Sequence, residues 1–214
     1  MNSNIHQALR QLPDYSDGLR YNLDGKDYPR PYQTIIVEGK LIRGLRICLD
    51  RQDLFEALFK QFGIVKGTYL DIGCQLGFFV KQMSFIFSEV LGIDCSESYI
   101  NSCKLLYPEL SNSFRLHDAN DLRTLPNADV VTALSMIEYV NDKEKFVKEL
   151  FEHTNQMCII EGHAPDIEKN VDYYWEMEIR KQPWQQVIRF EGLTEAGMNA
   201  SYSKGRPIWI CLKQ

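Results

Sequence analysis

The feature that most constrains the fold is a strand, a glycine turn, a helix and a second strand over residues 68–94. Residues 68–72 are an apolar run that contains Asp71, and a turn bounded by Gly73 and Gly77 follows it and opens a helical pattern. The second apolar run ends in Asp94. A βαβ unit of this kind places backbone N–H groups and a helix N-terminus at the carboxyl end of the first strand, where open α/β sheets bind ligands. The sequence therefore predicts a ligand site at this turn.

The spacing of the glycines separates two classes of ligand. The dinucleotide fingerprint needs G-x-G-x-x-G, and after Gly73 the next two required positions hold Gln75 and Phe78. That fingerprint therefore fails twice. The pattern D-x-G-C-x-x-G instead resembles the first motif of class I S-adenosylmethionine-dependent methyltransferases, with Gln75 where the family usually has a glycine.

The resemblance implies roles for the residues at the matching positions. In this family the turn at Asp71, Gly73 and Gly77 wraps the amino-acid end of the cofactor. The acid after the second strand, Asp94, takes both ribose hydroxyls, and Cys95 beside it is predicted to contact the cofactor as well.

Two later segments extend the resemblance. A short β-like run over 113–116 precedes Asp118 and Ala119, which match the third motif, where an acid and a neighbouring N–H bind adenine. A fourth apolar strand over 128–135 ends at Ser135, at the motif beside the methyl group. A lone glycine turn is often a plain connection between a strand and a helix. Four motifs in the right order favour the methyltransferase instead.

The residues for catalysis are predicted from position. Transfer to a hydroxyl is accelerated about 10²–10⁴-fold by a positioned base. His163 follows a predicted fifth strand over 157–162, and a histidine suits proton abstraction near neutral pH. The alternative interpretation is that His163 is a surface histidine hydrogen-bonded to the backbone. Glu161 is predicted to orient His163 or bind substrate, or else to be a solvent-exposed acid. Tyr139 is predicted to line the acceptor pocket, or to be an ordinary helix residue.

Arginines near residue 50 offer a partner for the cofactor carboxylate. Arg51 opens a helical pattern over 51–62 and is the predicted partner, whereas Arg43 and Arg46 are interpreted as solvated surface residues. No set of side chains has the spacing of metal ligands, so no metal is expected.

Alternation of strands and helices predicts an α/β fold with a mostly parallel sheet and helices on both faces. The resemblance implies a Rossmann-like sheet of seven strands whose last strand, 208–212, is antiparallel. Residues 1–50 are predicted to be an N-terminal arm or cap that contains a hairpin around Glu38-Gly39-Lys40, and 51–214 the methyltransferase domain.

Bulk properties restrict the partners. A net charge of −5 and a pI of 5.4 argue against a nucleic-acid enzyme, because binding to phosphates depends on basic residues. Six scattered cysteines without C-x-x-C pairs indicate reduced thiols. No signal core or apolar run of ~18–20 residues is present, so a cytoplasmic protein with no membrane partner is expected.

The sequence thus predicts an S-adenosylmethionine-dependent enzyme that methylates a small molecule, preferably a hydroxyl of a sugar or nucleotide-linked sugar. Methylation of nitrogen and a catalytically silent cofactor-binding subunit are the alternatives. A nicotinamide-dependent oxidoreductase remains a rival that a binding comparison would separate. The oligomeric state is left open.

Overall fold

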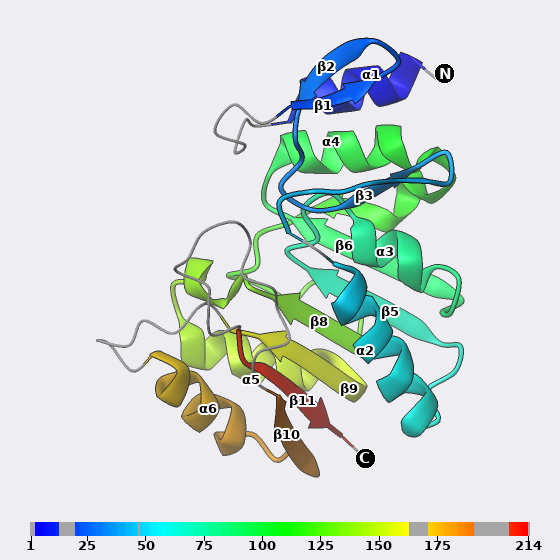
Figure 1. The fold of residues 1–214 in the computed structure, drawn as a ribbon. Coiled ribbons are helices and arrows are strands. Elements are labelled where there is room, and N and C mark those ends of the chain that lie inside the picture. Colours follow the sequence, from blue (N-terminus) through cyan, green and yellow to red (C-terminus); the bar gives the residue numbers. More distant parts are fainter. Residues whose placement is uncertain (1–2, 13–19, 47, 163–170, 191–205, 214) are drawn as a thin grey trace.

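A seven-stranded sheet organises the chain (Figure 1). The computed structural model describes residues 3–12, 20–46, 48–162, 171–190 and 206–213. The strands are, in spatial order, β10 (Gln186–Phe190), β11 (Ile208–Leu212), β9 (Thr154–Glu161), β8 (Ala128–Leu134), β5 (Thr68–Ile72), β6 (Glu89–Asp94) and β7 (Phe114–Leu116). All neighbouring pairs are parallel except those that β11 makes with β9 and β10. The prediction of a mostly parallel sheet with an antiparallel last strand is confirmed.

Helices cover both faces of the sheet. Alternate residues of each strand point to opposite faces, so one strand contributes to an apolar cluster on each side. Leu70 and Ile72 of β5 pack in one apolar cluster with α5 (Lys143–His153) and α6 (Val171–Lys181). Tyr69 of the same strand packs in another cluster with α2 (Leu49–Gln61) and α3 (Phe78–Met83). Trp175 and Ile179 of α6 are fully buried, so this aromatic helix packs on the sheet.

Side-chain caps set the beginnings of two helices. Ser96 accepts a hydrogen bond from the N–H of Tyr99 and so sets the beginning of α4 (Glu97–Leu106). Asp142 caps α5 through the N–H of Lys145. Short 3₁₀ helices follow at η1 (Pro108–Ser113) and η2 (Ile137–Tyr139). None of the helices within the described ranges is long and apolar enough to cross a membrane.

The described residues before α2, 3–12 and 20–46, are called the arm, which lies over α4 (Figure 1). It consists of α1 (Ser3–Arg10), the hairpin β1 (Arg20–Leu23) and β2 (Lys26–Pro29), and the hairpin β3 (Ile35–Val37) and β4 (Lys40–Ile42). The second hairpin was expected, whereas α1 and the first hairpin were missed. The sequence signal for the first hairpin was Asp24-Gly25, because the positive φ angles of these residues, 51° and 75°, suit a tight hairpin turn. The division at residue 50 stays a prediction, since the arm and α4 share one apolar cluster.

Gly77 has a packing role, and its replacement is a test of the turn. Its φ is +72°, and an added Cβ would lie 2.6 Å from the Phe114 ring. Gly77→Ala therefore combines a left-handed penalty of about 1–2 kcal/mol with an overpacking cost of about 1–3 kcal/mol. Gly63→Ala is the matched control, because Gly63 has a φ of +67° and open space around its Cβ position. We expect a clearly larger fall in Tm for Gly77→Ala; equal falls would show that the Phe114 ring yields freely.

Candidate active site

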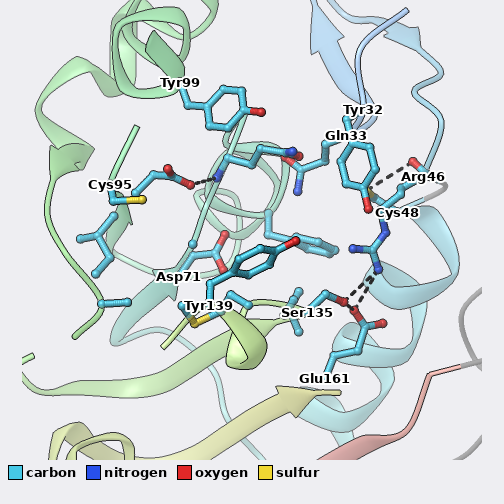
Figure 2. A pocket seen from close by; sticks show the side chains of 18 of the residues that line it. Tyr32, Gln33, Arg46, Cys48, Asp71, Cys95, Tyr99, Ser135, Tyr139 and Glu161 are labelled. Carbon is cyan, nitrogen blue, oxygen red and sulfur yellow. Dashed lines mark hydrogen bonds and ion pairs between the residues drawn. The ribbon is translucent and has the colours of Figure 1, made fainter. Parts of the chain in front are cut away.

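A cavity of about 440 Å³ opens at the carboxyl ends of the parallel strands (Figure 2). This volume is within the range of small-molecule sites. Ten of the twelve predicted site residues line it: Arg51, Asp71, Gly73, Asp94, Cys95, Asp118, Ala119, Ser135, Tyr139 and Glu161. Gly77 lies behind the turn as the N-cap of α3, and His163 lies outside the described residues. The sequence therefore identified one cavity, while the individual roles remain predictions.

Asp94 is held at the end of β6 by backbone donors. Its Oδ2 accepts the N–H of Gln75 at 3.0 Å, and its Oδ1 accepts the N–H of Ser96 at 2.9 Å. Burial raises the pKa of this carboxyl, and the backbone hydrogen bonds act against that rise. A carboxylate has about four acceptor positions, so each oxygen keeps capacity for a further donor. This arrangement fits a ligand with two neighbouring hydroxyls.

The turn itself is shaped by residues from two regions. Gln75 has a φ of +49°, a conformation that glycine adopts most easily, which explains why a glycine would be usual there. The hydrogen bond from the N–H of Gln75 to Asp94 helps to hold this strained backbone conformation. The next N–H, of Leu76, donates to Oε1 of Gln33 in the arm at 3.2 Å. The arm thus completes the hydrogen bonding of the turn.

Two other acids differ in environment. Asp71 is buried, and this desolvation raises its pKa to about 7 although Thr132 donates to its Oδ1 at 2.7 Å. Asp118 is more open, and hydrogen bonds from the backbone and side chain of Asn120 to its Oδ1 lower its pKa. Asp118 is therefore ionised near neutral pH, whereas burial disfavours the charged form of Asp71.

Glu161 forms the centre of a buried polar cluster at the other side of the cavity. Its side chain is 0% exposed, and it accepts from Arg51 Nε at 2.7 Å and from Arg46 Nη2 at 3.0 Å. The hydroxyl of Ser135 also donates a hydrogen bond to Glu161, and the backbone φ of Ser135 is +55°. Burial acts to raise the pKa of Glu161, but the two arginines and Ser135 outweigh it and hold the pKa below its ordinary value. A carboxylate so paired is a weak base and suits orientation of its partners.

The interpretation of Arg46 as a solvated surface residue was wrong. Its side chain is 19% exposed, lines the cavity and contacts both Glu161 and Ser135. Thr34 fixes the loop after β4 that carries Arg46. Its hydroxyl donates to the Arg46 carbonyl and accepts a hydrogen bond from the N–H of Gly44. No local pattern marks this residue, because its partners are about 90 and 115 residues away in the chain.

Aromatic side chains surround the opening. Tyr139, on η2, is 74% exposed yet lines the cavity, which is consistent with a position at the mouth. Tyr32 from the arm and Tyr99 from α4 line the cavity from other sides (Figure 2). Tyr32, Gln33, Arg46 and Arg206 also line the cavity and were not predicted as site residues, since the arm carries no recognisable motif and no role was predicted for the residues before β11. Within the described ranges, no group of three His, Cys, Asp or Glu side chains is placed to hold a metal ion.

Comparisons with known proteins relate the chain to methyltransferases. Residues 70–156 match the model of a family described as "Methyltransferase domain". A ubiquinone biosynthesis O-methyltransferase of Rhodopseudomonas palustris is 30% identical over 96 residues, which cover 44% of this chain and 38% of that protein. A protein of the same name from Bradyrhizobium diazoefficiens is 31% identical over 81 residues, or 37% of this chain and 32% of that protein. The matched stretch thus spans about a third of the length of these curated relatives.

Solved structures share the fold. The N-methyltransferase NodS of Bradyrhizobium japonicum, in complex with S-adenosyl-L-homocysteine, has a TM-score of 0.58 at 11% identity and covers 99% of both chains. The bifunctional kinase-methyltransferase WbdD has a TM-score of 0.57 at 22% identity, over 78% of this chain and 40% of that one. Residues 70–156 therefore carry a methyltransferase domain, and the fold of the chain is the one shared by these S-adenosylmethionine-dependent methyltransferases.

Proposed function

We propose that this chain binds S-adenosylmethionine and transfers a methyl group to a hydroxyl of a small molecule, a sugar or a nucleotide-linked sugar. The observation that carries the proposal is Asp94, whose carboxylate faces the cavity at the end of β6 with acceptor capacity on both oxygens. When bound, S-adenosylmethionine supplies a methyl group already activated by its sulfonium. The protein then has to hold and align the two reactants, which can lower the barrier by up to about 7–11 kcal/mol.

The lining residues fit the three parts of such a molecule. Asp94 would hold the ribose hydroxyls, and Asp118 with the N–H of Ala119 would bind the adenine. The turn at Gly73 would hold the amino-acid end, since buried Asp71 lies beside it and favours a cationic neighbour. These three regions follow one another along the edges of β7, β6 and β5, which is the order in which the parts of the molecule are joined.

Transfer to oxygen is supported by two observations. Both curated relatives are named O-methyltransferases. His163 follows β9 by two residues, so the chain brings an imidazole after the strand whose end, Glu161, lines the cavity. We assign His163 the role of base, Tyr139 a place in the acceptor wall, and Glu161 an orienting role, because its carboxylate is already paired.

The test begins with ligand binding and ends with turnover. S-adenosylhomocysteine is expected to raise the Tm of the full chain, while NAD is not; the reverse result would favour an oxidoreductase. Candidate acceptors are then screened for release of S-adenosylhomocysteine. His163→Ala is expected to slow turnover about a hundredfold with unchanged affinity for S-adenosylhomocysteine. Unaffected turnover would reject the base and favour methylation of nitrogen, where the amine arrives deprotonated.

A further inference from the structure

The cavity has two ends of opposite charge. Asp94 lies at the end of β6, whereas Arg46, Arg51 and Arg206 line the cavity near the end of β9, where the first two contact Glu161. Three strand spacings separate β6 from β9 in the sheet, which corresponds to about 14 Å. A ligand that spans the cavity would therefore contact the carboxylate of Asp94 at one end and the arginines at the other.

The basic end is assembled from three separate parts of the chain. Arg46 follows β4, Arg51 lies in the first turn of α2, and Arg206 precedes β11. Arg206 is 4% exposed and is brought beside β9 by a hydrogen bond from the N–H of Gly162 to the carbonyl of Pro207. Within the described ranges, three guanidinium groups thus line this end and one carboxylate, Glu161, lies among them.

Arg46 presents donors to the cavity. Its Nη2 contacts both Ser135 and Glu161, whereas its Nε and Nη1 have no hydrogen-bond acceptor among the residues that the structure describes. The guanidinium carbon lies 5.7 Å from the centre of the Tyr32 ring. Figure 2 shows the side chain entering the cavity above Ser135 and Glu161. Glu161 therefore fixes one edge of the guanidinium and leaves the rest of its fork for a ligand.

We propose that Arg46 and Arg206 bind an anionic group of the methyl acceptor, a phosphate or a carboxylate. This inference rests on the proposed function and names the class of acceptor. The planar guanidinium matches two oxygens of such a group, and burial strengthens the charge-assisted hydrogen bonds. A nucleotide-linked sugar carries phosphates that can accept from Nε and Nη1 of Arg46, whereas a neutral sugar offers this guanidinium no charged acceptor. The same chemistry is offered by the carboxylate of S-adenosylmethionine, so the experiment separates the two sources.

The probe is inorganic pyrophosphate, titrated against the full chain with and without saturating S-adenosylhomocysteine at constant ionic strength. We expect a saturable rise in Tm in both cases, because the acceptor anion and the cofactor occupy different ends. Arg46→Lys and Arg206→Lys should raise the half-maximal pyrophosphate concentration at least about tenfold. Lysine keeps the positive charge at each position and removes only the planar fork of the guanidinium. Arg43→Met, an exposed arginine of the arm, is the control and should match the unmodified chain.

Three results would overturn the inference. They are the absence of a saturable rise beyond that of sodium chloride, an unchanged response in both lysine variants, and competition between pyrophosphate and S-adenosylhomocysteine. The last would assign the basic end to the cofactor carboxylate. Failure of S-adenosylhomocysteine to bind the unmodified chain would instead contradict the proposed function, and the pyrophosphate response of the free protein would still decide the anion site.

Discussion

Asp94→Ala is expected to lower the affinity for S-adenosylhomocysteine about 10²–10⁴-fold. The carboxylate is predicted to accept two ribose hydroxyls, and hydrogen bonds to a charged group contribute about 1.5–3 kcal/mol each. Loss of both corresponds to about 3–6 kcal/mol, which gives that range at about 1.4 kcal/mol per factor of ten. Isothermal titration calorimetry measures the change directly.

A second effect of the Asp94 replacement needs a control. The carboxylate also accepts the N–H groups of Gln75 and Ser96, so its removal can loosen the turn. Asp94→Asn separates the two effects, because the amide oxygen keeps one acceptor for the backbone while the charge is lost. Glu89→Ala is the matched control on the same strand, since Glu89 is exposed at the opposite end of β6. Affinity that survives in both Asp94 variants would reject the ribose assignment.

Glu161→Gln is expected to destabilise the fold by about 3–5 kcal/mol, because it leaves two arginines around a buried neutral side chain. Arg51 is 4% exposed, so its charge has little access to water. At about 2–4 °C per kcal/mol for a chain of this size, the Tm should fall by about 6–20 °C. Differential scanning calorimetry of the full chain gives the measurement.

A carboxylate with the same number of arginine partners provides the comparison. Glu176 pairs with Arg180 and Arg189, but its side chain is 23% exposed. Glu176→Gln should therefore cost about 1 kcal/mol or less, as expected for ion pairs near the surface. Similar falls in Tm for the two variants would mean that the burial of Glu161 adds nothing.

The effect of Glu161→Gln should depend on pH with a defined sign. The pKa of Glu161 in the folded chain lies below its ordinary value of 4.5. A carboxyl with a lowered pKa stabilises the fold above its unfolded pKa, and that stabilisation is lost as the pH falls through the lowered value. The difference in Tm between Glu161→Gln and the unmodified chain should be constant near neutral pH and shrink below about pH 4.5. A difference that grows in acid would contradict the pairing.

Part of the fold and of the site could be read from local patterns. The strand, turn and acid between residues 68 and 94 predicted the position of Asp71, Gly73 and Asp94, because these residues lie at the carboxyl ends of adjacent parallel strands. Asp118 and Ser135 were predicted to line the same cavity for the same reason. The helical pattern predicted over 51–62 was close to α2, which begins at Leu49 and ends at Gln61.

The sequence by itself determined the class of sheet, which follows from the periods of apolar residues, and the resemblance to methyltransferases, which follows from four short motifs in order. The tertiary structure alone decided the basic end of the cavity. Arg46 and Glu161 are separated by 115 residues, and Gln33 reaches a turn 43 residues away. Contacts at such separations leave no period or spacing in the chain, because they arise from the docking of the arm on the sheet and not from either segment alone.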